Sequence, residues 1–237
     1  MPSGCCGENV AVPKPSIIAI DGPAGTGKST ISERLAEKYG YLFVDTGAFY
    51  RAITYVVLKG NVPYEDVDAV TAVLSTLNLR IEHDGVSSYR IIANGEDVTD
   101  HLRSKSVESH VSPISKMTVV REALLPLQRK VAAQGNVILA GRDIGTVVLP
   151  EADLKLYIDA SLSERARRRH LQMMDAGKEA DLDTVVNDMQ RRDKIDTERS
   201  LAPLTRAEDA IYILTDNKTI DDVMQEIIQI IEHWTAT

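Results

Sequence analysis

Short apolar runs recur along the chain, separated by longer segments in which apolar residues return every three or four positions. A short apolar run bounded by turn residues is typical of a strand buried on both faces, and the longer spacing is typical of an amphipathic helix. Strands are predicted at 16–21, 41–44, 137–140, 154–158 and 210–214. Helices are predicted at 28–39, 46–58, 67–77, 118–134, 161–174, 182–192 and 219–234.

Two details bear on the helix boundaries. Pro126 lies inside the predicted helix 118–134 and should kink or divide it. Thr219, with Asp222 three residues later, is a typical N-terminal cap for the last helix.

The alternation of strands and helices predicts an α/β fold, with a central parallel five-stranded sheet flanked by helices. Ligands of such sheets bind outside the carboxyl ends of the strands. We therefore expect the loops after Ile20, Val44, Ala140 and Ile158 to converge on one site.

One stretch interrupts this alternation. Residues 79–82 and 89–93 flank a turn at Asp84-Gly85, and Asn94-Gly95 marks another turn, which favours a small antiparallel hairpin. A segment of about 63–106 is thus predicted to be an inserted subdomain. Residues 1–15 are rich in Gly and Pro and carry no period, which favours a flexible tail.

The loop after the first strand carries the most specific motif. Residues 22–29, GPAGTGKS, match the phosphate-binding loop G-x-x-x-x-G-K-[ST] and lie between a predicted strand and a helix, as the mechanism requires. Lys28 is placed to reach the β and γ phosphates, and Ser29 to ligate Mg²⁺. ATP is expected to contact Gly22, Pro23, Ala24, Gly25, Thr26, Gly27, Lys28, Ser29 and Thr30.

Two further strand ends carry candidate groups for a second phosphate. Thr46 and Arg51 follow the second strand, and Arg142 and Asp143 follow the strand 137–140. Guanidinium groups suit phosphate oxygens, and P-loop enzymes often place an acid at such a strand end for Mg²⁺ or its water. Taken singly, Thr46 could be a helix cap, Arg51 a solvated side chain, and Arg142 with Asp143 a structural salt bridge.

Composition narrows the class of protein. The 237 residues carry 27 Lys and Arg against 35 Asp and Glu, a formal charge of −8, which disfavours a nucleic-acid polymer as partner. No apolar run is long enough to span a bilayer, and the first residues lack the pattern of a secretion signal. Cys5 and Cys6 are the only cysteines and offer no disulfide framework. A cytoplasmic protein is expected.

The chain resembles the bacterial cytidylate kinases, the (d)CMP kinase branch of the nucleoside monophosphate (NMP) kinases. The segments that carry the resemblance occur in the family's order between about residues 16 and 233. They are IDGPAGTGKST, VDTGAFYRA, VREALLPLQR, AGRDIGTVVLP, YIDASLSERARRR and RRDKIDTERSLAPL. The phosphate loop is shared by many families, whereas GRDIGTVV and the RRD segment are far more diagnostic.

The resemblance implies a P-loop kinase fold with an NMP-binding subdomain at about 63–106 and a mobile lid at about 161–192. It implies a monomer that transfers the γ-phosphoryl group of Mg²⁺-ATP to CMP or dCMP. The residues implied to bind CMP are Thr46, Arg51, Ser112, Arg121, Arg142, Asp143, Arg192, Asp196 and Arg199. The residues implied to act in catalysis are Lys28, Arg142, Asp143, Arg165, Arg168 and Arg169, and which of the last three covers the transferred group stays open.

Three other functions compete with this one. A related P-loop kinase would use UMP or shikimate as its acceptor. A nucleotide sensor would keep the phosphate loop without an organised acceptor side, which the paired sets at Thr46/Arg51 and Arg142/Asp143 make unlikely. A nucleic-acid-dependent ATPase would need a basic tract with interleaved aromatic residues.

Overall fold

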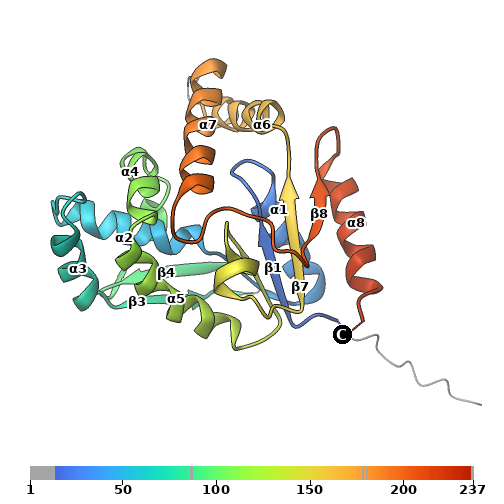
Figure 1. Cartoon of the computed structure of the whole chain (residues 1–237), viewed down its shortest axis with the longest axis horizontal. Helices are drawn as coiled ribbons and strands as arrows, with labels where there is room; N and C mark the ends of the chain where they lie inside the picture. Colours follow the sequence, from blue (N-terminus) through green and yellow to red (C-terminus); the bar gives the residue numbers. More distant parts are fainter. Residues whose placement is uncertain (1–13, 86–87, 178, 180, 236–237) are drawn as a thin grey trace, which may run out of the picture.

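The computed structural model describes residues 14–85, 88–177, 179 and 181–235, and a five-stranded parallel sheet forms its centre (Figure 1). The strand order is β2-β6-β1-β7-β8. The strands are β1 (Ile17–Asp21), β2 (Leu42–Asp45), β6 (Val137–Ala140), β7 (Leu154–Asp159) and β8 (Ile211–Leu214). The predicted α/β class and all five predicted strands are confirmed. Cys5 and Cys6 lie outside the described residues.

Side chains of β1 alternate between two hydrophobic cores, because successive residues of a strand point to opposite faces. Ile18 and Ile20 face α1 (Lys28–Tyr39) and α8 (Ile220–Glu232). Ala19 faces the core formed with α2 (Gly47–Lys59), α4 (Lys105–Ser115) and α5 (Thr118–Ala132). The sheet is thus covered on both faces, which leaves its strand ends to build a site.

A second sheet belongs to the predicted insertion. The strands β3 (Leu79–His83), β4 (Tyr89–Ala93) and β5 (Glu96–Asp97) are antiparallel in the order β3-β4-β5. The predicted hairpin is therefore present, and β5 adds a third strand. α3 (Val67–Thr76) and a short 3₁₀ turn, Thr99–His101, flank this sheet. Buried Ile91 joins it to the core on the α2 side of the central sheet.

Two long helices stand at the carboxyl end of the central sheet (Figure 1). α6 (Leu162–Asp175) and α7 (Leu182–Glu198) pack on each other around Ala166, Val185 and Met189. The helix predicted at 182–192 thus continues for six more residues, which brings Asp196 onto the same helix as Arg192.

One local prediction needs correction, and two elements were not predicted. Pro126 does not divide α5, because buried Val120, Leu124 and Val131 on either side anchor one continuous helix. α4 was missed, since Pro113 interrupts its apolar pattern, and in the structure it lies inside that helix. The π-helical turn Ile144–Val148 has no period that sequence analysis recognises.

Candidate active site

A cleft of about 500 Å³ opens at the carboxyl end of the sheet. It is lined by residues of the phosphate loop, the β2–α2 and β6 loops, and α4, α5, α6 and α7. Three of the four loops expected to converge do so. The fourth, after Ile158, contributes no lining residue among those described; there Ala160 accepts a hydrogen bond from Arg165.

The phosphate loop has the conformation that its glycines allow. Gly22, Gly25 and Gly27 have φ of 144°, 82° and 90°, a region that side chains with Cβ rarely adopt. A Cβ on Gly22 would lie 1.9 Å from the carbonyl oxygen of Ile158, so only glycine fits there. The loop is therefore shaped by backbone contacts with the sheet.

Lys28 is buried and closes over its own loop. Its Nζ donates to the carbonyl oxygen of Pro23 at 2.6 Å and to Thr26 Oγ1 at 3.3 Å. Burial lowers the pKa of the Lys28 ammonium well below its usual 10.5, and the nearby charge of Arg142 lowers it further. An anion beside Lys28 would relieve both effects, so the site favours a phosphate there.

One buried carboxylate, Asp143, organises two arginines in the cleft. The Asp143 carboxylate accepts a hydrogen bond from Arg121 Nη2 and another from Arg199 Nη2 at 3.2 Å, so it forms an ion pair with both arginines. Arg121 donates in turn to the carbonyl oxygen of Ser115 and lies over the ring of Tyr50. Burial, then the charge of Arg121, lowers the pKa of Arg199. Two arginines thus share one buried carboxylate, and Arg121 is also bonded to the backbone.

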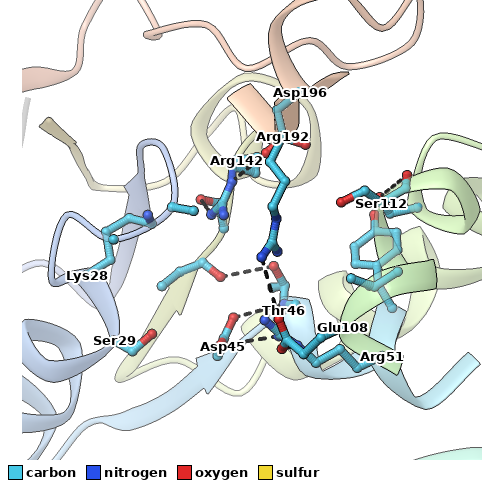
Figure 2. A pocket seen from close by; sticks show the side chains of 18 of the residues that line it. Lys28, Ser29, Asp45, Thr46, Arg51, Glu108, Ser112, Arg142, Arg192 and Asp196 are labelled. Carbon is cyan, nitrogen blue, oxygen red and sulfur yellow. Dashed lines mark hydrogen bonds and ion pairs between the residues drawn. The ribbon is translucent and has the colours of Figure 1, made fainter. Parts of the chain in front are cut away.

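Further ion pairs line the cleft beside this cluster and around Arg51 (Figure 2). Arg142 Nε donates to Asp196 Oδ2 at 2.9 Å. Arg51 Nε donates to Glu108 Oε1 at 3.1 Å, and the same carboxylate lies 3.5 Å from Arg192 Nη1. These ion pairs cross between elements far apart in the sequence.

Most residues expected at the site do line this cleft. Thr46 is held in place by a hydrogen bond from its Oγ1 to the carbonyl oxygen of Ala140 at 2.9 Å. The expected residues found in the lining are Ala24, Gly25, Gly27, Lys28, Ser29, Thr30, Thr46, Arg51, Ser112, Arg121, Arg142, Asp143, Arg169, Arg192, Asp196 and Arg199. Gly22, Pro23 and Thr26 complete the phosphate loop without lining the cleft.

The three arginines of α6 differ in their surroundings. Arg165 is buried and binds both carboxylate oxygens of Asp193 on α7, at 3.1 and 2.6 Å. Arg168 binds Glu164 and donates to the carbonyl oxygen of Thr215. Arg169 lines the cleft and makes no hydrogen bond or ion pair within the described residues.

Sequence reasoning assigned no role to four carboxylates at or near the site: Asp21, Glu33, Asp45 and Glu108. Asp21 ends β1, is buried, and accepts from the amides of Ile144 at 2.8 Å and Gly145 at 2.7 Å. It thereby joins the start of the phosphate loop to the loop of Asp143. Its place at the end of a buried strand was the available signal. Glu108 lies on α4, the helix that was itself missed.

The described residues contain no group of three or more His, Cys, Asp or Glu side chains that could hold a metal ion. No helix among them has both the length and the apolar character needed to cross a membrane.

Known proteins align with nearly the whole chain. The family model described as cytidylate kinase matches residues 18–233. A cytidylate kinase of Geobacillus sp. (strain WCH70) is 44% identical over 214 residues, which cover 90% of this chain and 95% of that protein. A cytidylate kinase of Caldicellulosiruptor saccharolyticus is 45% identical over 213 residues, covering 90% of this chain and 94% of that protein. The chain belongs to the cytidylate kinase family.

Proposed function

We propose that the protein transfers the γ-phosphoryl group of ATP to CMP or dCMP, giving ADP and CDP or dCDP. The observation that carries this proposal is the Arg121–Asp143–Arg199 cluster, which lies in the same cleft as the phosphate loop. Membership in the cytidylate kinase family supports it independently.

The donor nucleotide is assigned to the phosphate loop. Backbone amides of residues 22–27 and the N-terminus of α1 favour an anion at this place. Lys28 binds the β and γ phosphates once it leaves the carbonyl oxygen of Pro23. We assign ATP to residues 22–30 on these grounds.

The acceptor phosphate is assigned to Thr46, Arg51 and Arg142. The two guanidinium groups come from different elements and can each make paired hydrogen bonds to phosphate oxygens. Arg192 and Asp196, on α7, are assigned to the sugar. Residues 63–106 are proposed as the NMP-binding subdomain and residues 161–192 as the lid.

The base is assigned to Ser112, Arg121, Asp143 and Arg199. Cytosine carries an exocyclic amino donor beside a ring nitrogen acceptor, and uracil reverses both. A carboxylate such as Asp143 accepts from the amino group, while a guanidinium donates to the ring nitrogen. Uracil would bring a donor where cytosine has an acceptor and an acceptor where cytosine has a donor, so its hydrogen bonds to these groups would be lost, which makes the site selective.

The reaction needs no general base, because the attacking oxygen belongs to an ionised phosphate. Catalysis then consists of placing the two substrates in line and neutralising the transferred charge. Arg169 is proposed as the lid arginine that covers the transferred group, since Arg165 and Arg168 are engaged elsewhere. Their proposed role is to hold α6 against α7 and the phosphate loop. Closure of the lid would exclude water from the reaction.

Mg²⁺ is proposed to accompany ATP. In kinases it is held mainly by nucleotide phosphates, with one or two protein oxygens. Ser29 and Asp45 both line the cleft and offer such oxygens, whereas Asp143 is already paired with two arginines. Ser29 and Asp45 would hold the ion, and bound Mg²⁺ neutralises charge on the phosphates.

A coupled ADP-release assay against CMP, dCMP, UMP, AMP, GMP and shikimate tests the function. We expect turnover of CMP and dCMP at least about tenfold above every other acceptor in kcat/KM. Lys28→Ala should lose this activity, and Lys38→Ala, at the far end of α1, should keep it. A contaminating kinase would give equal activity in both preparations. Higher kcat/KM for UMP or shikimate would overturn the assignment of the base.

A further inference from the structure

Glu108 lies where α2, α4 and α7 meet in the acceptor half of the cleft. Its Oε1 accepts from Arg51 Nε at 3.1 Å, and its Oε2 lies 3.5 Å from Arg192 Nη1 (Figure 2). Arg51 lies on α2 and Arg192 on α7, so one carboxylate holds two arginines from separate elements. Nothing in the transfer reaction derived above uses this carboxylate.

The surroundings keep Glu108 ionised. Burial alone would raise its pKa, but Arg51 and then Arg192 outweigh burial, and the pKa lies below its usual value of 4.5. The pairing also affects Arg51. Burial would lower the pKa of its guanidinium, but the charges of Asp45 and Glu108 outweigh burial and raise that pKa. About a fifth of the Glu108 side chain is exposed, so water screens this charge only in part.

The contact on Arg51 is the kind that a phosphate makes. A carboxylate and a phosphate oxygen both accept charge-assisted bonds from a guanidinium, at similar distances. An acceptor phosphate that binds Arg51 must therefore displace Glu108 or bind beside its negative charge. Either outcome costs binding free energy that grows with the charge of the ligand.

We propose that Glu108 is a specificity-determining residue that competes with the acceptor phosphate for Arg51. It weakens the binding of phosphorylated acceptors more than the binding of the unphosphorylated nucleoside. This inference rests on the proposed function, because it takes a nucleoside monophosphate as the acceptor. It also implies that the diphosphate product, with its greater charge, is released more readily than it would be without Glu108.

Isothermal titration of the full chain with CMP, CDP and cytidine tests this competition. Glu108→Gln keeps the shape and removes the charge, so Kd for CMP should fall about 3- to 10-fold and Kd for CDP at least as much. Kd for cytidine and KM for ATP should change less than about twofold. Glu151→Gln, at an exposed glutamate outside the cleft lining, is the matched control and should change none of them.

Other results of these titrations would overturn the proposal. If Glu108 instead orients Arg51 for the phosphate, Glu108→Gln will bind CMP more weakly, and the proposal is wrong. Equal gains for CMP and cytidine would also overturn it, because the effect would then not depend on the phosphate. Glu108→Ala, checked by circular dichroism, must move Kd for CMP in the same direction as Glu108→Gln. A wild-type chain that binds no CMP at all would instead contradict the proposed function.

Discussion

At the scale of single residues, the cleft pairs most of its arginines with acids from other elements. Asp143 holds Arg121 and Arg199, and Asp196 holds Arg142. A guanidinium that is already oriented loses less side-chain entropy when it binds a ligand. The Asp143 pairs therefore hold Arg121 and Arg199 in fixed positions in the cleft, within a chain of net charge −8.

The isosteric change Asp143→Asn tests the base assignment. It leaves Arg121 and Arg199 without a full counter-charge and offers an amide where the cytosine amino group would donate. KM for CMP should rise about 10- to 100-fold, and KM for ATP should stay within about twofold. Steady-state kinetics with each substrate varied measure both. Equal changes in the two constants would place Asp143 outside the acceptor site.

Asp21 should make stability depend on pH. Burial raises the pKa of its carboxyl from 3.8 to about 6, although the amides of Gly145 and Ile144 oppose the shift. The folded state then keeps a proton that the unfolded state releases. The free energy of unfolding should therefore fall as pH rises from about 4 to about 6, by on the order of 3 kcal/mol from this group.

Urea denaturation at pH 4, 5, 6 and 7 measures this dependence against Asp21→Asn, which cannot titrate. The difference in unfolding free energy between the two proteins should change across this range and level off above about pH 7. A difference that stays constant from pH 4 to 7 would show that Asp21 titrates at its ordinary pKa.

At the scale of elements, α6 presents arginines with separate tasks on one helix. Arg165 and Arg168 bind α7, the phosphate loop and the segment after β8, so they fix where the helix stands. Arg169 lies one turn after Arg165 and lines the cleft. The helix is thus anchored by two arginines and presents a third to the cleft.

Truncating Arg169, the α6 arginine that lines the cleft, should impair turnover more than substrate binding. For Arg169→Ala we expect kcat to fall about 100-fold, while KM for ATP and CMP stays within about threefold, because charge builds at the transferred group in the transition state. Arg167→Ala is the matched control, since Arg167 is exposed on the same helix and pairs only with Glu164. A loss of equal size in both variants would indicate a general effect on α6.

At the scale of the whole molecule, the sheet brings the proposed donor half and the proposed acceptor half of the cleft together at the carboxyl ends of its strands. β1 lies between β6 and β7, so the phosphate loop after β1 stands beside the loop after β6 that carries Arg142 and Asp143. The donor half is built from the phosphate loop, and the acceptor half from arginines and acids of several helices. The two halves should therefore differ in their need for a metal.

Removal of divalent ions with EDTA should separate the two halves. Transfer from ATP to CMP should be lost, because the phosphates would then carry unneutralised charge, and should return when Mg²⁺ is restored. CMP binding measured by isothermal titration should change less than about threefold, because its proposed partners are arginines. Strong loss of CMP binding in EDTA would place the metal in the acceptor half as well.

The sequence by itself determined the features that depend on neighbours along the chain. These features are the strand–loop–helix at residues 17–39, the five apolar strands and the cap at Thr219. Each is a local pattern, because backbone conformation and burial follow short-range periodicity in the sequence. The segments GRDIGTVV and RRDKID also indicated the family before any geometry was known.

Only the tertiary structure decided which charges meet. Arg51 with Glu108, Arg142 with Asp196, and Arg165 with Asp193 are pairs between separate elements, and no local pattern specifies them. Of the three arginines Arg165, Arg168 and Arg169 on α6, packing places only Arg169 in the lining of the cleft. Ion pairs form wherever packing brings opposite charges within reach, so they follow from the arrangement of the elements in space.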